Sequence, residues 1–468
     1  MSQAEFDLVI TGGTIVNDDS ERVADIGIRG EQIAAVGTGL SGRQVIDATG
    51  KYVLPGGVDP HVHFSAYDAP PEPAWVDDFG SGSRAAAAGG ITTVGHMSYP
   101  WYEQTLGETI ARDQALAVRD GIIDFAIHPV LTNPDTQPIS EIPELAAQGH
   151  TTLKYFMSLG KYMSDPAPYV HAMRLARASD VPVLIHCEDA ALLQDAMAAL
   201  VEQGTLTPEY YPRSRPQTSE AAATARAIAF AEQTGASLYV VHLSCIPALN
   251  EVRRGRERGV DAWIETRPIY LFLTEERFAE SDGGKYFGQP PLRTQADQDA
   301  LWAALANGEI DTVATDHAPW MYADKVGGHL DIRTIPPGVA DLDVMPPMLW
   351  SHGVNTGRIS RQRFVQVSSS NAARLLGLYP RKGALAVGSD ADIVIWDADL
   401  TREIRAADFQ SQSDYTPYEG WSNTGWPVVT ISRGDVIARD GHVTAASGRA
   451  RVPRRDRVPV LGSAFRQV

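Results

Sequence analysis

The sequence predicts an α/β protein: a (β/α)8 TIM-like barrel with a small β-sandwich domain built from both chain ends. Three observations support this fold class. Apolar, strand-like runs alternate with helical stretches through the middle of the chain. Eight such runs can be counted, which is the number that closes a parallel barrel. Segments in which valine and isoleucine alternate with polar residues, separated by glycine-containing turns, lie on either side of this region.

These changes of pattern along the chain set the expected domain boundaries. Residues 1–54 and 379–448 share the alternating pattern, as in FDLVITGGTIV and PVVTISRGDVIARDGHV, and are expected to pair into one sandwich. Residues 55–378 are expected to form the barrel. Residues 449–468 are basic and contain proline, and we expect a surface tail or arm there.

The eight expected barrel strands are short runs rich in β-branched and aromatic residues. Helical stretches such as AALLQDAMAALVEQG and SEAAATARAIAFAEQTG separate most of them, which indicates parallel βα units. The runs are KYVLPGGVD, ITTVGHM, IIDFAIHPV, HTTLKYFMS, VPVLIHC, SLYVVHL, VDAWIETRP and DTVATDH.

Composition excludes several classes of partner. The formal net charge of −18 argues against nucleic acid and anionic membrane surfaces. No apolar run reaches the roughly 20 residues that a membrane-spanning helix needs, and the start MSQAEFDLVI does not resemble a signal peptide. Only Cys187 and Cys245 occur, which fits a reducing compartment. We therefore expect a cytoplasmic protein.

The stretch LPGGVDPHVHF places His61 and His63 one residue apart at the end of the first barrel run. Side chains at i and i+2 of a strand point to the same face, so both imidazoles would enter one space. Such a pair is a common start of a metal site, because neutral imidazole binds zinc-like ions well. The alternative is a turn that carries two solvated histidines.

Further polar residues lie at the ends of other expected strands, where the chemistry of such barrels is located. They are Lys154 on the fourth run, His186 on the fifth, His242 on the sixth and Asp316 on the eighth. A single histidine at such a place is often structural. Four histidines and an aspartate at one end of one barrel favour a metal centre.

Lys154 is unusual because it lies inside the apolar run TTLKYFMS, where a buried ammonium group is costly unless it is paired. One interpretation is a salt bridge to a neighbouring acid. The other is an amine of lowered pKa that reacts with carbon dioxide. The resulting carbamate would be an anionic ligand able to bridge two cations.

With these residues in place, the chain resembles the cyclic-amide hydrolases of the amidohydrolase superfamily, namely dihydropyrimidinases, hydantoinases and allantoinases. The similarity extends over nearly the whole chain. It rests on GGVDPHVHF, AAAAGGITTV, LKYFM, LIHCED, VVHLS, IETRPIYL, PPLR, ATDHAP and SSSNAARLLGLYPRKGALAVGSDADIVIWD.

The resemblance implies a centre of two divalent metal ions, with zinc as the first choice and manganese or cobalt as alternatives. His61, His63 and Asp316 would hold one ion, and His186 and His242 the other. Lys154, carboxylated by carbon dioxide, would bridge the ions together with a hydroxide. Asp316 would then move the proton from the attacking water to the leaving nitrogen.

Three expected substrate positions depart from the family pattern. Leu159 stands where dihydropyrimidinases and D-selective hydantoinases have a tyrosine, Gln289 replaces a serine, and Pro337 replaces an asparagine. These losses predict a pocket shaped more by packing than by hydrogen bonds. Phe64 and His96 are two further candidate contacts. The pocket mouth is expected in the loops 64–76, 97–103 and 157–166.

The leading hypothesis is a metal-dependent hydrolase of C–N bonds other than peptide bonds, which opens a cyclic amide, imide or ureide. Allantoinase activity and hydrolysis of a linear amide or carbamate are the alternatives on the same centre. A non-catalytic dihydropyrimidinase-like scaffold is a third possibility, against which the retained ligand set argues. The resemblance also implies a homo-oligomer, tetramer or dimer, acting on a small molecule without nucleic acid or membrane.

Overall fold

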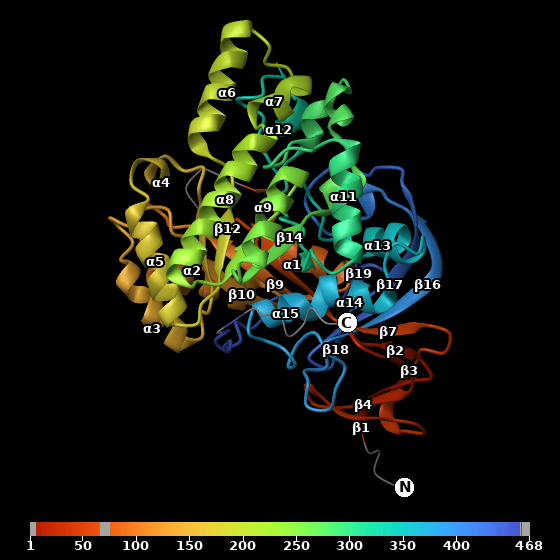
Figure 1. The fold of residues 1–468 in the computed structure, drawn as a ribbon. Coiled ribbons are helices and arrows are strands. Elements are labelled where there is room, and N and C mark those ends of the chain that lie inside the picture. The colour runs from red at the N-terminus through yellow and green to blue at the C-terminus, as the bar shows by residue number, and fades with distance from the viewer. Residues whose placement is uncertain (1–5, 66–74, 329, 459, 461–468) are drawn as a thin grey trace.

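The computed structural model describes residues 6–65, 75–328, 330–458 and 460, and Figure 1 shows its ribbon. A barrel with helices around it forms the larger part. Strands from both chain ends lie together at one side of it, red and blue in Figure 1. The fold class predicted from the sequence is therefore confirmed.

The barrel contains eight parallel strands that follow the predicted runs in order. Two sheets hold them, β10–β9–β8 and β11–β12–β13–β14–β15. The strands are β8 (Gly57–Val62), β9 (Ile91–Ser98), β10 (Asp124–Pro129), β11 (Leu153–Phe156), β12 (Val183–His186), β13 (Leu238–Val240), β14 (Ala262–Thr266) and β15 (Thr312–Val313).

Short parallel bridges join the two sheets into a closed barrel. Val130 bridges Lys154 between β10 and β11, and Val62 bridges His317 between β8 and the segment after β15. The His63 amide also donates to the His317 carbonyl at 2.8 Å. Closure brings the first and last strands together, so residues about 250 positions apart in sequence become neighbours.

Helices follow the strands and cover the barrel, and their ends carry the expected caps. Asp78 accepts from the Ser81 amide at the start of α1, and Gly204 ends α6 in the left-handed conformation. The longer helices are α1 (Phe79–Ala88), α2 (Leu106–Asp120), α3 (Ile142–Gln148), α5 (Ala167–Ala178), α6 (Ala190–Gln203), α8 (Gln217–Thr234), α9 (Ile246–Glu257) and α11 (Gln295–Ala306). Shorter ones are α4 (Gly160–Ser164), α7 (Tyr211–Ser214), α10 (Pro268–Phe272), α12 (Tyr322–Val326), α13 (Met345–Leu349), α14 (Arg361–Val365) and α15 (Asn371–Leu375).

The sandwich packs a four-stranded sheet, β5–β4–β1–β6, against a seven-stranded sheet, β19–β18–β17–β16–β7–β2–β3. Their shared core includes Ile10, Ile26, Ile393 and Ile431, which come from both ends of the chain. The strands are β1 (Phe6–Thr11), β2 (Thr14–Val16), β3 (Glu21–Val23), β4 (Asp25–Arg29), β5 (Gln32–Gly37), β6 (Gly42–Asp47), β7 (Tyr52–Pro55), β16 (Ile393–Glu403), β17 (Ser422–Ser432), β18 (Asp435–Arg439) and β19 (His442–Val443).

The first predicted barrel run is divided between two sheets. β7 pairs with β16 in the sandwich, and only β8 enters the barrel. The chain changes sheets at Gly56, where a Cβ atom would come within 2.2 Å of the Thr92 hydroxyl. A single apolar run in the sequence therefore serves two cores, because glycine permits close backbone approach at the junction.

The basic tail runs along the barrel as far as the structure describes it. The Phe125 amide donates to the Arg451 carbonyl at 2.8 Å, and the Val458 amide donates to the Asp180 carbonyl at 3.0 Å. Arg455 is buried, and its guanidinium donates to the Thr152 hydroxyl at 3.0 Å. We expected a surface tail here, but residues 449–458 pack against the barrel. Residues 459 and 461–468 lie outside the described part of the chain.

Candidate metal centre

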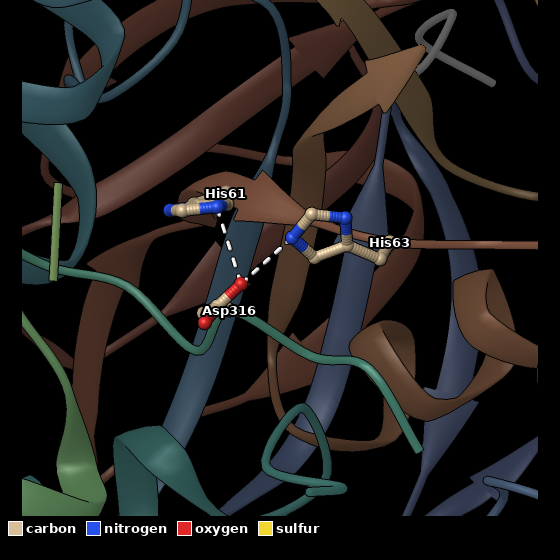
Figure 2. A group of neighbouring side chains, drawn as sticks. All are labelled: His61, His63 and Asp316. Carbon is tan, nitrogen blue, oxygen red and sulfur yellow. Dashed lines mark hydrogen bonds and ion pairs between the residues drawn. The ribbon is translucent and has the colours of Figure 1, made fainter. Parts of the chain in front are cut away.

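Three of the predicted ligands meet at the carboxyl end of the barrel (Figure 2). His61 lies at the end of β8, His63 follows this strand, and Asp316 follows β15. The Asp316 Oδ1 atom lies 3.1 Å from His61 Nε2 and 2.7 Å from His63 Nε2. Asp316 takes a backbone φ of +48°, which few residues with side chains adopt. This backbone turns the carboxylate toward the two imidazoles.

The other two histidines form a second, adjacent pair. His186 ends β12, and its Nδ1 atom lies 2.9 Å from the His242 Nε2 atom. The His242 ring centroid is 5.6 Å from that of His61. The four histidines therefore surround one space, as expected for residues at the ends of neighbouring barrel strands.

Lys154 lies on β11 and is fully buried. Among the described residues, its Nζ atom has no hydrogen-bond partner, and it lies 4.6 Å from the centroid of the Phe156 ring. Burial lowers the pKa of its amine from 10.5 to about 8. The salt bridge considered from the sequence is absent from the described part of the chain. The amine is left without a partner beside the ligands.

Neighbouring carboxylates determine which nitrogen of two histidines is available. The His61 Nδ1 atom contacts Glu265 Oε1 at 2.8 Å, and the His186 Nε2 atom contacts Glu188 Oε2 at 2.7 Å. A proton on each of these nitrogens leaves the opposite nitrogen with a lone pair. Those lone pairs belong to His61 Nε2 and His186 Nδ1, which face Asp316 and His242.

Burial favours the neutral, metal-binding form of His63, His186 and His242. It lowers the pKa of His63 to about 4, and it lowers the pKa values of His186 and His242 as well. Burial would raise the pKa of Asp316, but Arg267 and the two nearest histidines bring it well below its usual range. The donor set is thus neutral imidazole, carboxylate and an unpaired amine, which fits divalent cations of the zinc type.

Arg267 is the main cation near Asp316. It follows β14, is fully buried, and its Nη1 atom lies 2.9 Å from Asp316 Oδ2. Asp316 therefore uses one oxygen toward the histidines and the other toward the guanidinium. This ion pair fixes the orientation of the carboxylate.

A cavity of about 180 Å³ opens over the candidate ligands. Its wall is largely aromatic, and the Trp75 and Tyr99 rings lie 5.0 Å and 5.8 Å from the His63 ring. The lining residues are His61, His63, Trp75, Tyr99, Phe156, His186, His242, Arg267, Gln289, Asp316, Ala318, Trp320, Pro337 and Gly338. The cavity thus combines the candidate ligands with a mostly apolar wall.

Two of the five candidate substrate contacts, Gln289 and Pro337, line this cavity, and three do not. Phe64 is buried and packs against the rings of Phe79 and His96. The His96 Nε2 atom lies 3.2 Å from the Asp113 carboxylate.

Leu159 precedes α4 and packs against the apolar core. For the expected pocket mouth, residues 66–74 lie outside the described part of the chain. Trp75 and Tyr99 from the first two expected loops do line the cavity.

Sequence reasoning missed the residues that support the ligands. Glu265, Arg267 and Glu188 are buried charged residues that contact them directly. A signal for them existed, since IETRP and HCED place charged residues at the ends of apolar runs. An unpaired charge is costly there, so each such residue needed a partner or a function.

Comparison with known proteins now identifies the family. A model described as "Amidohydrolase family" matches residues 52–437. The chain belongs to this family. The matched region begins at β7 and ends within β18, so it includes the whole barrel and part of the sandwich.

Curated members of the amidohydrolase family match over nearly the full chain. D-hydantoinase of Rhizobium radiobacter is 37% identical over 447 residues, covering 94% of this chain and 97% of that protein. D-phenylhydantoinase of Escherichia coli O9:H4 (strain HS) is 36% identical over 454 residues, covering 96% and 98%.

Solved structures in the family share the fold. D-hydantoinase (dihydropyrimidinase) from Thermus sp. superposes with a TM-score of 0.92 at 36% identity, covering 97% of this chain and 100% of that one. L-hydantoinase (dihydropyrimidinase) from Arthrobacter aurescens gives a TM-score of 0.88 at 30% identity, covering 96% and 100%. Proteins named D-hydantoinase and L-hydantoinase therefore both have this architecture.

Proposed function

We propose that this amidohydrolase is a metal-dependent hydrolase that opens a cyclic amide, imide or ureide ring. The observation that carries the proposal is the convergence of His61, His63 and Asp316. The buried Lys154 amine, which has no hydrogen-bond partner among the described residues, interacts electrostatically with His63 and Asp316. The names of the relatives, D-hydantoinase and D-phenylhydantoinase, support a ring of the hydantoin type.

Two divalent ions would be held by the six predicted ligands. His61, His63 and Asp316 would bind one, His186 and His242 the other, and Lys154 would contribute to both. For this, the neutral amine adds to carbon dioxide, forming an N–C bond and releasing one proton. When bound, such ions supply a water of lowered pKa and polarise the carbonyl group of the substrate.

Asp316 would move the proton. Its pKa lies well below the usual range, so it is ionised at neutral pH and can accept a proton from the attacking water. Water adds to the carbonyl carbon, the ring C–N bond breaks, and Asp316 returns the proton to the leaving nitrogen. Protonation is required because an unprotonated amide nitrogen leaves poorly.

The residues around Asp316 hold it for this role. Arg267 fixes one carboxylate oxygen at 2.9 Å, while the other faces His63 at 2.7 Å. Arg267 is fully buried, and burial strengthens its electrostatic contact with Asp316. Glu265 and Glu188 orient His61 and His186 and are positioning residues.

The direct test is a substrate panel with metal analysis. Purified protein reconstituted with zinc, manganese or cobalt is assayed on hydantoins, dihydropyrimidines, allantoin, cyclic imides and linear N-acyl compounds. We expect about two ions per chain and turnover on at least one cyclic class. Turnover only on allantoin or on linear amides would select those alternatives. Full metal content without any turnover would refute the proposal.

We also propose a cytoplasmic homo-oligomer, tetramer or dimer. Both cysteines are buried free thiols, which fits a reducing compartment. Among the described residues, no helix has both the length and the apolar character to cross a bilayer. Light scattering tests the assembly: a monomer at working concentration would contradict it.

A further inference from the structure

The candidate ligands are divided between the two sheets of the barrel. His61 belongs to β8 and His63 follows it, in the sheet β10–β9–β8. Lys154 and His186 belong to β11 and β12 of the other sheet, and His242 follows β13. The placement of one group of ligands relative to the other therefore depends on how the two sheets are joined.

The join between β10 and β11 is concentrated at one point. A parallel bridge connects Val130 with Lys154, and the Leu131 amide donates to the Lys154 carbonyl at 2.8 Å. Nearer the amino end of β10, Phe125 and Ile127 direct their backbone groups to the same edge as Leu131, because residues two apart in a strand do so. These groups bond the C-terminal tail.

The tail fills the seam between the two strands. The Phe125 amide donates to the Arg451 carbonyl at 2.8 Å. The Arg455 guanidinium donates to the Ile127 carbonyl of β10 at 2.9 Å and to the hydroxyl of Thr152, the residue before β11, at 3.0 Å. One side chain thus connects both strands. A guanidinium suits this place because its donors form a fixed planar fork.

The buried position of Arg455 carries a cost. Among the described residues no carboxylate forms an ion pair with it, and burial lowers the pKa of its guanidinium to about 9. A buried cation that meets only neutral acceptors is unfavourable. Arg454 holds the same segment from the surface without this cost, by donating to the Ala147 carbonyl at 2.6 Å. Anchoring the tail therefore does not explain why Arg455 is buried.

The seam lies next to the candidate metal centre. Thr152 is two residues before Lys154, and its hydroxyl also lies 2.7 Å from the Nδ1 atom of His128 on β10. His128 is fully buried and interacts electrostatically with Lys154 and His61. Arg455, Thr152 and His128 thus form a chain of contacts that leads from the tail to ligands of both sheets.

We propose that Arg455 is a positioning residue of the metal centre. By closing the seam, it holds the strand that carries Lys154 in place relative to the sheet that carries His61 and His63. This inference rests on the proposed function, because it concerns the ligands of the same centre. The C-terminal tail then belongs to the site although it supplies no ligand.

Hydrogen exchange of the metal-free protein, read by mass spectrometry, tests the seam. The Leu131 amide reports on the seam, and the Val241 amide, which donates to the Ile185 carbonyl at 3.2 Å, reports on the other sheet. In Arg455→Met, exchange at Leu131 should be roughly tenfold faster, as for the loss of one hydrogen bond, while Val241 keeps its rate. Equal acceleration at both amides would mark a general loss of stability and overturn the inference.

Competition with a chelator tests the consequence for the metal centre. Arg455→Met should weaken zinc affinity about 10–100-fold. The carbamate signal in carbon-13 NMR of protein supplied with labelled bicarbonate should fall with it. Arg454→Met is the matched control, because this adjacent, exposed arginine loses the same charge, and it should bind zinc as the wild type does. Arg455→Lys keeps the charge but not the planar fork, and its zinc affinity should lie between those of the wild type and Arg455→Met.

The outcomes separate this inference from the proposed function. Unchanged zinc affinity or unchanged Leu131 exchange in Arg455→Met overturns the positioning role. If Arg455→Met does not fold, Arg455→Lys is measured instead, and an affinity equal to that of the wild type overturns it. If the wild type opens no ring but Arg455→Met still weakens zinc binding, the proposed function fails and the inference stands.

Discussion

Replacing Lys154 by methionine should raise the stability of the protein without metal. The same replacement should abolish turnover after reconstitution with metal. The amine is fully buried, and among the described residues nothing hydrogen-bonds it. Methionine has a similar length and no charge, so it can fill the same space. The variant therefore separates the cost of the amine to folding from its value to metal binding.

The size of the effect follows from the pKa of the amine. Burial lowers this pKa from 10.5 to about 8, and each unit corresponds to about 1.4 kcal/mol. The protonated amine thus costs the fold about 3 kcal/mol below pH 8. Between pH 8 and 10.5 the unfolded chain binds more protons than the folded one. Stability of the metal-free wild type should therefore rise with pH across this window.

The assay is urea unfolding of chelator-treated protein in buffers free of carbon dioxide, at pH 7 and pH 10. At pH 7, Lys154→Met should exceed the wild type by about 3 kcal/mol, and most of this difference should vanish at pH 10. Metal content after reconstitution should fall for the variant. Lys161→Met is the control, because this partly exposed lysine is paired with Asp135 at the surface.

Two results would refute this reasoning. If Lys154→Met is as stable as the wild type or less stable at pH 7, the buried amine is not an uncompensated cost. If the variant binds two ions per chain with full turnover, Lys154 is not a ligand. Either outcome would leave the histidine and aspartate assignments standing.

Three further predictions concern the site and its surroundings. Asp316→Asn should stay folded but lose turnover by roughly 10²–10⁴-fold, as measured by steady-state kinetics, and near-normal rates would remove it from proton transfer. Glu188→Gln should weaken metal affinity about 10–100-fold in competition with a chelator, because Glu188 orients His186, and equal affinity would contradict that role. Burial raises the pKa of Asp343 to about 7, so between about pH 4 and 7 the folded protein binds a proton that the unfolded chain does not. The free energy of unfolding should therefore fall as pH rises across this window. Asp343→Asn should recover up to about 4 kcal/mol at pH 8 and little at pH 4 in urea unfolding, and a gain independent of pH would refute the assignment.

The sequence by itself determined the barrel and the positions of the candidate ligands. Strands and helices leave local periodicities of two and about four residues, which can be read without any tertiary contact. The carboxyl ends of parallel strands must meet at one face of a barrel. Polar residues that end those runs, such as His186 and Asp316, could therefore be grouped in advance although 130 positions separate them.

Only the tertiary structure decided what surrounds those ligands. Phe64 directly follows His63 in sequence, yet its ring packs behind the cavity wall, because side-chain direction depends on where the strand ends and on what packs there. Gln289 and Pro337 both line the cavity, and Lys325 joins their two loops by donating to the carbonyls of Phe287, Pro336 and Gly338. Such contacts join segments far apart in sequence and leave no periodic pattern, so composition and spacing carry no trace of them.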